Sequence, residues 1–293
     1  MELCIDFGGT EVKLAAIADG RVRASRSLPV GGTPADLDAT ADAAREMLAQ
    51  DGLRADVVGI AVPGVVDPST GRMLQANAKY DYLRGADLDA WSRAEFELPA
   101  AVENDARAAL IGETSTGSAA GEQDAVLVTL GTGIGTAAMI GGVPLRGRSG
   151  HAGILGGHMT VELDGPVCPC GNVGCGEELA SAHALRTREH VDMRELFAGD
   201  AHDELRAYTL RVWGAVVTSL VHAYDPAVVI LSGGVMRAGA AVQGPVEEFV
   251  RAHAWASLPR PRFVVPTEPE LSVARGLSVV ARREHIHHDQ EEL

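Results

Sequence analysis

Several strand-like segments of this chain end in a glycine-rich turn, and this pattern constrains the fold most strongly. Apolar runs of strand type lead into the sequences DFGGT, VPG, LGTGIG and LSGG. Between them lie segments with the apolar spacing of helices, among them 36–50, 203–223 and the closing segment 271–284. Strands that alternate with helices indicate an α/β protein built on parallel or mixed sheets.

The glycine turns also indicate a type of ligand. In open α/β sheets a ligand sits beyond the carboxyl ends of the strands, where glycine lets backbone N–H groups approach an anion. One such turn is more often only a change of chain direction, but three along one chain favour a shared polyanionic ligand, a nucleotide. The first turn, Asp6 to Thr10 with Lys13 nearby, offers amides and a hydroxyl for phosphate and a carboxylate for magnesium.

Composition excludes several classes of protein. The chain has 293 residues, 46% of them hydrophobic, which suits a globular protein with a large core. Its net charge of −15 argues against nucleic-acid binding, because such binding depends on Lys and Arg. There is no Gly-Lys pair, hence no Walker-type phosphate loop. No signal peptide and no apolar run of about 18 residues is present, so we expect a soluble cytoplasmic protein without a membrane partner.

The motifs, in this order, resemble those of the ROK family, the sugar kinases and sugar-responsive repressors of the actin-like ATPase superfamily. DFGGT resembles the first phosphate motif, VENDARAALIGE the catalytic segment, LGTGIG the second phosphate motif and DPAVVILSGGV the adenosine-side motif. The long stretch GHMTVELDGPVCPCGNVGCGEELAS matches the family signature. The likeness runs almost from end to end of the chain.

The resemblance implies an α/β fold of two actin-like (ribonuclease H-like) domains, each a mixed sheet flanked by helices, with an active-site cleft between them. We expect a small domain of residues 1–115 plus 272–293, and a large domain of residues 116–271. MgATP would be bound by residues of the three turns. These are Asp6, Gly8, Gly9, Thr10 and Lys13, then Gly131, Thr132, Gly133 and Gly135, and finally Gly233 and Gly234.

The resemblance also implies a structural zinc ion held by one histidine and three cysteines, and the matching residues are His158, Cys168, Cys170 and Cys175. Three thiolates and an imidazole complete a tetrahedral zinc shell, which stabilises structure and leaves no position open for catalysis. The alternative is three reduced cysteines in a loop without metal. The fourth cysteine, Cys4, lies in an apolar segment and is expected to be a core residue.

The same resemblance assigns the reaction. Asp105 matches the general base, which takes the proton of a sugar hydroxyl as its oxygen attacks the γ-phosphate, most simply at O6 of a hexose. Taken alone, Asn104-Asp105 is only a helix N-cap. Sugar binding is assigned to Asn77, Asn104, Asp105, His158 and Glu177, with His158 also on zinc.

The sequence departs from the family at one sugar contact. Most kinases of the family carry Ala-Gly-Glu-x-Gly-His before the zinc loop, whereas this chain reads Ala152-Gly153-Ile154-Leu155-Gly156-Gly157-His158. Ile154 stands where the glutamate is expected, with one residue inserted. Because isoleucine accepts no hydrogen bond, we expect a different or broader sugar preference, and which hexose is used stays open.

Two other functions compete with the kinase. A sugar-responsive transcription regulator of this family carries a helix-turn-helix ahead of the DFGGT-like segment, and only five residues precede Asp6 here. A catalytically silent sugar sensor is the third interpretation, which Ile154 favours and Asp105 opposes. The resemblance further suggests a homodimer or homotetramer with hexose and ATP as its small-molecule partners.

Overall fold

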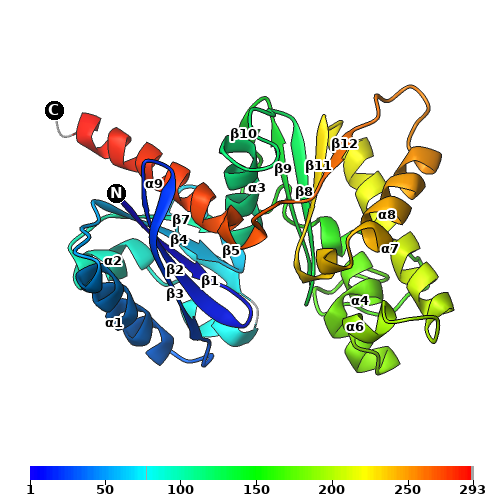
Figure 1. Ribbon diagram of the computed structural model, residues 1–293, viewed down its shortest axis with the longest axis horizontal. Coiled ribbons are helices and arrows are strands. Elements are labelled where there is room, and N and C mark those ends of the chain that lie inside the picture. Colours follow the sequence, from blue (N-terminus) through cyan, green and yellow to red (C-terminus); the bar gives the residue numbers. More distant parts are fainter. Residues whose placement is uncertain (77, 292–293) are drawn as a thin grey trace. The chain divides into compact units, whose positions relative to one another are not determined.

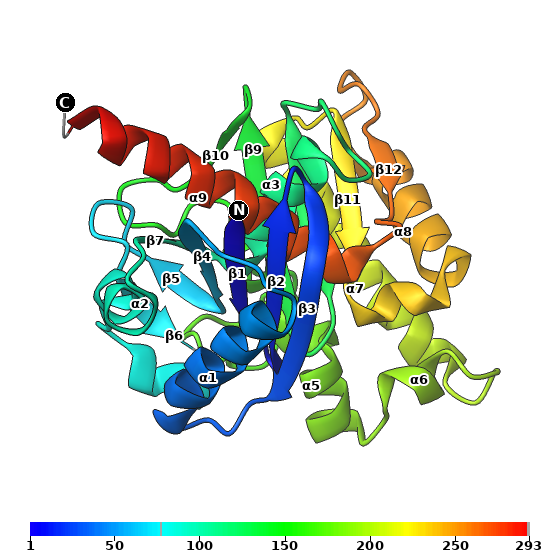
Figure 2. The same ribbon diagram turned by 60° about the vertical axis from the view of Figure 1, so that its left-hand side comes forward.

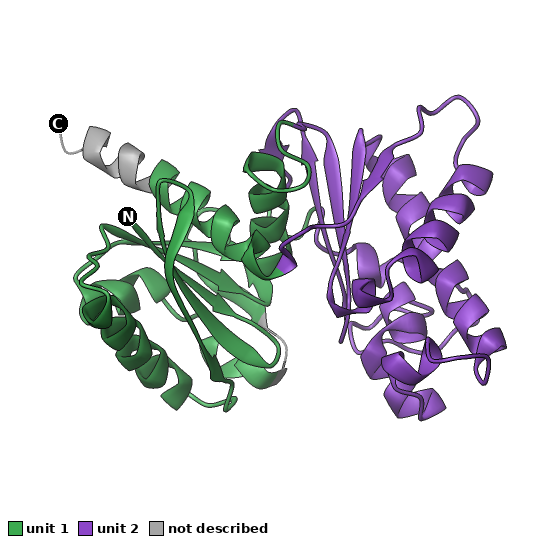
Figure 3. Cartoon of the chain, viewed as in Figure 1, with its two compact units in different colours: residues 1–121, 146–152, 270–293 green, residues 122–145, 153–269 purple. Residues whose placement is uncertain are grey.

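The computed structural model describes residues 1–76 and 78–291, and the side chains of all of these except 76, 78 and 284–291. The chain forms two compact units (Figure 3). Unit 1 comprises residues 1–121, 146–152 and 270–293, and unit 2 comprises residues 122–145 and 153–269. Within the described part of the chain, every helix is too short or too polar to cross a membrane.

Unit 1 is built on a five-stranded mixed sheet (Figures 1 and 2). In spatial order its strands are β3 (Arg21–Pro29), β2 (Glu11–Ala18), β1 (Glu2–Phe7), β4 (Val57–Val62) and β7 (Ala100–Asn104). The first three form an antiparallel meander, and β4 and β7 add in parallel to β1. A small hairpin, β5 (Gly64–Val66) with β6 (Met73–Ala76), and the 3-10 helix η1 (Ala78–Leu83) follow β4 in the sequence.

Alternation along the strands divides the core of unit 1 into two layers. Leu3, Ile5 and Phe7 of β1 pack toward α1 (Ala35–Gln50) and α2 (Leu88–Phe96). Cys4, one residue out of step, packs toward α3 (Asp105–Ser115) and α9 (Ser272–Glu291). Because side chains alternate faces along a strand, Asp6 lies on the same side of the sheet as Cys4. Cys4 is 1% exposed, so it is the buried core residue that the sequence predicted.

Unit 2 repeats this topology in a second sheet (Figure 1). Its strands are β10 (Val143–Pro144), β9 (Ile134–Ile140), β8 (Ala125–Leu130), β11 (Val228–Ser232) and β12 (Arg262–Val264). Again the first three are antiparallel and the last two run parallel to the central strand. The long helices α7 (Asp203–Tyr224) and α8 (Ala240–His253) bury Trp213, Val217 and Val246 against β8 and β11.

Shorter elements complete unit 2. They are η2 (Gly156–His158), α4 (Gly176–Ala180), α5 (Ala182–Ala184), η3 (Leu185–Glu189), α6 (Met193–Leu196), η4 (Gly234–Ala238) and η5 (Pro269–Leu271), the last of which ends in unit 1. The expected α/β class with mixed sheets flanked by helices is confirmed. The predicted helices 36–50 and 203–223 are present as α1 and α7, each one residue longer.

Unit 1 holds residues 116–121, 146–152 and 270–271, which the sequence assigned to the second domain. Residues 116–121 fold back on the end of α3, where the N–H of Gly121 donates to the carbonyl of Thr114 over 2.9 Å. Residues 146–152 belong to unit 1 because the buried guanidinium of Arg107 donates to the carbonyls of Gly150 and Ala152, at 3.0 and 3.3 Å. Both attachments are made by groups of α3.

Parallel pairing brings the motifs of each unit to one sheet edge. In unit 1, Asp6 pairs with Ala61 of β4, and Val62 beside it pairs with Asn104 of β7. The segments DFGGT, VPG and END therefore leave the sheet together. In unit 2, Thr129 of β8 pairs with Ser232 of β11, so that LGTGIG and SGG share an edge in the same way.

Candidate functional site

The first glycine turn joins β1 to β2 in unit 1. The N–H of Gly8 donates inside the turn, to the carbonyls of Asp6 and Glu11 at 3.0 and 3.1 Å. A side chain at Gly8 would place its Cβ 2.8 Å from the carbonyl oxygen of Glu11, which explains the glycine. Gly9 and Thr10 are exposed. Their N–H groups, and not that of Gly8, are therefore the donors that this turn offers to a ligand.

Asp6 is a buried carboxylate with an unmet acceptor. Its side chain is 9% exposed, and Oδ1 has no hydrogen-bond partner among the described residues. Burial, together with the negative charge of Asp105, raises the pKa of Asp6 to about 7, although Lys13, its partner across the β1–β2 pair, opposes the shift. A buried acceptor of this kind requires a donor or a cation.

A groove gives access to this carboxylate. It has a volume of about 380 Å3 and lies on the α9 side of the unit 1 sheet. Asp6 and Lys13 line it together with the apolar side chains of Ala274 and Leu277. The groove therefore opens Asp6 to small ligands although the side chain is nearly buried.

Asn104 and Asp105 stand at the start of α3. Asn104 is the N-cap, and its Oδ1 accepts the N–H of Arg107 at 3.0 Å. Its Nδ2 donates to the carbonyl of Gly64 and to Oδ1 of Asp105, both at 3.0 Å. The N–H of Ala106 donates to the same Oδ1 at 2.8 Å. Asn104 thus caps the helix and also fixes the carboxylate of Asp105.

Burial raises the pKa of Asp105 to about 6, although the hydrogen bonds from Ala106 and Asn104 favour its charged form. The charge of Asp105 in turn raises the pKa of Asp6. Two carboxylates with raised pKa values at one sheet edge, one of them buried and the other half-buried, are typical of functional sites, because burial that costs stability is usually retained for chemistry.

A buried ion-pair network behind Asp105 was not predicted. Glu103 is 2% exposed and Arg107 is 1% exposed, and Oε1 of Glu103 accepts from Arg107 over 2.7 Å. The other oxygen, Oε2, accepts a short hydrogen bond from Arg146. A Glu and an Arg four residues apart are the signal that the sequence offered, but that spacing also occurs on exposed helices.

In unit 2 the second glycine turn, Gly131 to Gly135, is held by the segment that follows the cysteine loop. The carbonyls of Gly131 and Thr132 accept the N–H groups of Ala182 and His183, at 2.9 and 3.1 Å. The N–H of Ile134 donates to Oε2 of Glu177 over 2.8 Å. Glu177, predicted for the sugar, therefore also fixes this turn.

The third turn, at Gly233 and Gly234, begins directly after β11. Gly233 has a φ of 94°, and a Cβ there would lie 2.3 Å from the carbonyl oxygen of Leu130. Glycine at this position thus lets β11 end close against the end of β8, where the second turn starts.

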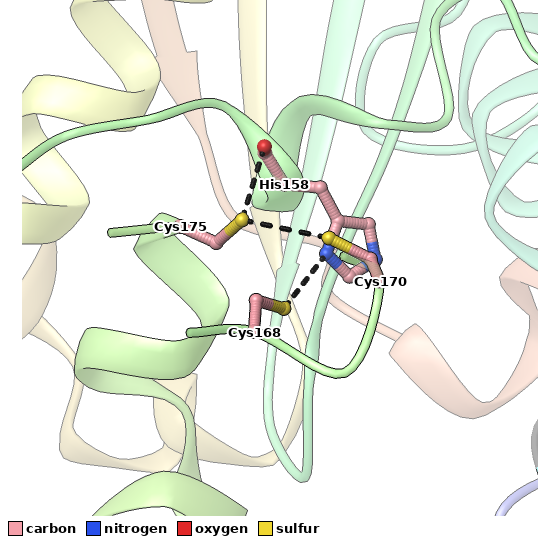
Figure 4. A group of neighbouring side chains, drawn as sticks. All are labelled: His158, Cys168, Cys170 and Cys175. Carbon is pink, nitrogen blue, oxygen red and sulfur yellow. Dashed lines mark hydrogen bonds between the residues drawn. The ribbon is translucent and has the colours of Figure 1, made fainter. Parts of the chain in front are cut away.

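His158, Cys168, Cys170 and Cys175 come together in unit 2 as the sequence predicted (Figure 4). Their ligand atoms all lie within 4.8 Å of one another. The Sγ atoms of Cys170 and Cys175 are 3.7 Å apart, as are Sγ of Cys168 and Nδ1 of His158. Zinc–sulfur bonds of about 2.3 Å give tetrahedral edges of about 3.8 Å, so the cluster has the size of a zinc shell.

The surroundings of the cluster also suit a metal cation. Burial, and then the neighbouring thiols, raise the pKa of Cys175 to about 12, so a cation is needed to hold this group as thiolate. The second ring nitrogen of His158, Nε2, lies 3.7 Å from Oε1 of Glu177. A carboxylate behind a metal-ligating histidine orients the ring toward the metal.

The remaining predicted positions are less defined. Asn77 lies outside the described residues. Ile154, in unit 2, is half-buried in the turn that precedes η2, and its neighbour Leu155 is 43% exposed.

Sequence comparison identifies relatives along most of the chain. A family model described as the ROK family matches residues 2–284. A glucokinase of Thermotoga maritima is 31% identical over 277 residues, which cover 84% of this chain and 86% of the glucokinase. A xylose repressor of Bacillus spizizenii is 28% identical over 221 residues, which cover 72% of this chain and 56% of the repressor.

Solved structures agree with this result. The ROK hexokinase from Thermus thermophilus has a TM-score of 0.82 and 29% identity, with 97% of this chain and 99% of the hexokinase covered. A ROK family glucokinase from Streptomyces griseus, in complex with glucose and AMPPNP, has a TM-score of 0.81 and 26% identity, with 96% and 99% covered.

Proposed function

The chain belongs to the ROK family, and from this membership we propose that it is an ATP-dependent sugar kinase. It transfers the γ-phosphate of MgATP to a hydroxyl of a hexose, at O6, with Asp105 as general base. The observation that carries the proposal is the pair of carboxylates with raised pKa values, the buried Asp6 and the half-buried Asp105, beside an exposed glycine turn. The glucokinase and hexokinase relatives support the same reaction class.

Asp105 acts on the sugar. With a pKa of about 6 it is ionised at neutral pH and still basic enough to accept a proton late in phosphoryl transfer. The hydrogen bonds to its Oδ1 hold the carboxylate in one orientation, and its other oxygen, Oδ2, takes the proton of the attacking hydroxyl. Such positioning supplies much of the catalysis in this reaction class.

The glycine turns bind the nucleotide. The N–H groups of Gly9 and Thr10 are the donors of unit 1, and Lys13 adds a positive charge beside them. The LGTGIG turn and Gly233–Gly234 are the corresponding phosphate and adenosine-side segments of unit 2. Backbone N–H groups at such turns suit oxyanions because they are fixed in place before the ligand arrives.

Asp6 fits a magnesium ion, directly or through its water, because its buried Oδ1 lacks a partner among the described residues. When bound, magnesium neutralises the charge that develops on the phosphates. The cluster of His158 and three cysteines fits a structural zinc ion by donor type and size. Zinc bound there would fix the loop from which His158 and Glu177 contact the sugar.

The test is direct. The purified protein is incubated with MgATP and a panel of hexoses that includes glucose, mannose, fructose, allose and N-acetylated hexoses, and sugar phosphates are identified by mass spectrometry. The proposal predicts one or a few phosphorylated hexoses. No product from any sugar, in protein that retains its zinc, would overturn it.

A second candidate is a sugar-responsive protein that binds hexose without turnover, and the similarity to a xylose repressor favours it. Such a protein would bind a sugar in calorimetry but release no ADP from MgATP. The family also suggests a homodimer or homotetramer, which sedimentation of the purified chain would test.

A further inference from the structure

Two side chains of η1 donate hydrogen bonds to consecutive carbonyl groups of the first glycine turn. The hydroxyl of Tyr80 donates to the carbonyl oxygen of Gly8 over 2.7 Å. The ammonium group of Lys79 donates to the carbonyl oxygen of Gly9 over 2.8 Å. Neither residue belongs to one of the predicted phosphate, catalytic or zinc motifs. Both contacts span about 70 residues of sequence.

These contacts fix the direction of two N–H groups. In a planar trans peptide the N–H points opposite to the C=O of the same unit, and no described peptide bond is cis. The carbonyl of Gly8 shares its peptide unit with the N–H of Gly9, and the carbonyl of Gly9 shares its unit with the N–H of Thr10. Holding both carbonyls toward η1 therefore directs both N–H groups away from η1.

The ring of Tyr80 is itself fixed. Tyr80 is 0% exposed, and it packs edge-on against Phe7, the residue before Gly8, with ring centroids 5.9 Å apart. Tyr82 contacts it from another side, at 6.0 Å between centroids. A hydroxyl on a ring that is locked in the core has little freedom, so its hydrogen bond to Gly8 loses little entropy when it forms.

The positions of the two lysines also connect η1 with the first glycine turn. The chain contains only two lysines, Lys13 and Lys79, among many arginines. Lys13 stands opposite Asp6 in the β1–β2 pair, and Lys79 binds Gly9 in the turn between these strands. An ammonium group is a compact donor that reaches a single carbonyl oxygen, whereas the wide guanidinium fork suits two acceptors.

We propose that Lys79 and Tyr80 are positioning residues that aim the N–H groups of Gly9 and Thr10 at the phosphates of the nucleotide. The inference rests on the proposed kinase function and adds two residues to it. It predicts a specific division of effects: loss of either contact weakens ligands that carry phosphates and leaves the affinity for adenosine unchanged.

The first variant is Tyr80→Phe, which removes only the hydroxyl and keeps the ring in the core. The matched control is Tyr82→Phe, because Tyr82 lies in the same helix and donates its hydroxyl to Oδ2 of Asp36, away from the turn. Dissociation constants for ADP and for adenosine are measured by calorimetry. We expect Tyr80→Phe to bind ADP roughly three- to tenfold more weakly, as for one lost hydrogen bond, with adenosine unaffected.

Lys79 is tested by Lys79→Met, which removes the donor, and by Lys79→Arg, which restores one. Lys79→Met is expected to weaken ADP binding by a similar factor, and Lys79→Arg to recover at least part of the loss. Equal losses of ADP and adenosine affinity in Tyr80→Phe, or ADP affinity equal to that of Tyr82→Phe, would overturn the inference while the kinase proposal stands. If the wild-type chain binds no ADP at all, the kinase proposal fails first.

A measurement on the wild-type protein makes the test independent of variant folding. Because the chain has only two lysines, amine acetylation followed by mass spectrometry measures the reactivity of Lys13 and of Lys79 separately. We expect saturating MgATP to slow the acetylation of Lys79, because bound phosphates stabilise the turn, and adenosine to leave the rate unchanged. Equal rates with and without MgATP would contradict the inference.

Discussion

Nδ2 of Asn104 donates to Oδ1 of Asp105 over 3.0 Å, while Oδ1 of the same amide caps α3 through the N–H of Arg107. The side-chain amide of Asn104 cannot flip without losing both hydrogen bonds. The cap of the helix and the orientation of the Asp105 carboxylate therefore depend on each other. A third bond, from Nδ2 to the carbonyl of Gly64, ties the pair to the turn after β4. The N-cap interpretation and the catalytic interpretation of this pair are therefore compatible.

The raised pKa of Asp105 predicts an acid limb in the rate. Only the carboxylate accepts the sugar proton, and its pKa is about 6, so kcat/KM should fall as the pH falls through about 6. An unperturbed carboxyl would place this limb near pH 4. The limb near pH 6 should be missing from the residual rate of Asp105→Asn, which separates it from the ionisation of ATP and of Asp6. A wild-type rate that stays constant down to pH 5 would be inconsistent with this assignment.

The four-ligand cluster predicts one zinc ion per chain. Cys168→Ala removes one ligand from a closed shell, so we expect loss of zinc in metal analysis and a lower melting temperature. Cys4→Ala is the matched control, because Cys4 is buried in unit 1 and has no part in the cluster. Protein that contains no zinc when purified without chelator would favour the metal-free loop.

Ile154 predicts an altered sugar preference. A glutamate at this position would offer a charged acceptor to a sugar hydroxyl, and a hydrogen bond to a charged group contributes about 1.5–3 kcal/mol. Ile154→Glu should therefore change the ratio of kcat/KM between two hexoses by about tenfold or more. Leu155→Glu, one residue along the same turn and 43% exposed, serves as control. An unchanged hexose profile in Ile154→Glu would remove Ile154 from the account.

The Glu103–Arg107 pair predicts a large stability effect. Both side chains are almost fully buried, and removing Arg107 takes from the Glu103 carboxylate its buried partner and leaves Arg146, a side chain that is 36% exposed. Arg107→Met should lower the free energy of unfolding by about 3–5 kcal/mol. The exposed pair of Arg93 with Asp89 has the same four-residue spacing, and Arg93→Met should cost less than about 1 kcal/mol. The free energies of unfolding are measured by urea denaturation. Similar losses for the two variants would contradict the prediction that burial makes the Glu103–Arg107 pair the more important one.

The sequence predicted the parts of the site that are local in the chain. The glycine turns, the Asn104-Asp105 helix start and the cysteine loop each carry their signal within a few residues, because strand period, cap chemistry and zinc-ligand types are local properties. The alternation of strands with helices indicated the α/β class, and the family resemblance, which comparison confirms, connected these segments as motifs of one family.

The parts that were missed depend on contacts between distant segments. Arg146 reaches Glu103, and Tyr80 reaches Gly8, across 43 and 72 residues of sequence. Spacing alone does not distinguish these side chains from the many other Arg residues and the three other Tyr residues of the chain. Gly8 shows the same limit on a smaller scale, because its N–H is used within the turn and only the register of β1 and β2 reveals it.

The most direct test of Asp105 as general base is the rate of ADP release by Asp105→Asn, measured with the best hexose from the panel. It is compared with the rates of wild type and of Asp38→Asn, which changes an exposed carboxylate of α1. General base catalysis predicts that kcat of Asp105→Asn falls by about 10²- to 10⁴-fold while Asp38→Asn retains wild-type activity. Sugar-dependent ADP release by Asp105→Asn at the wild-type rate would contradict the account.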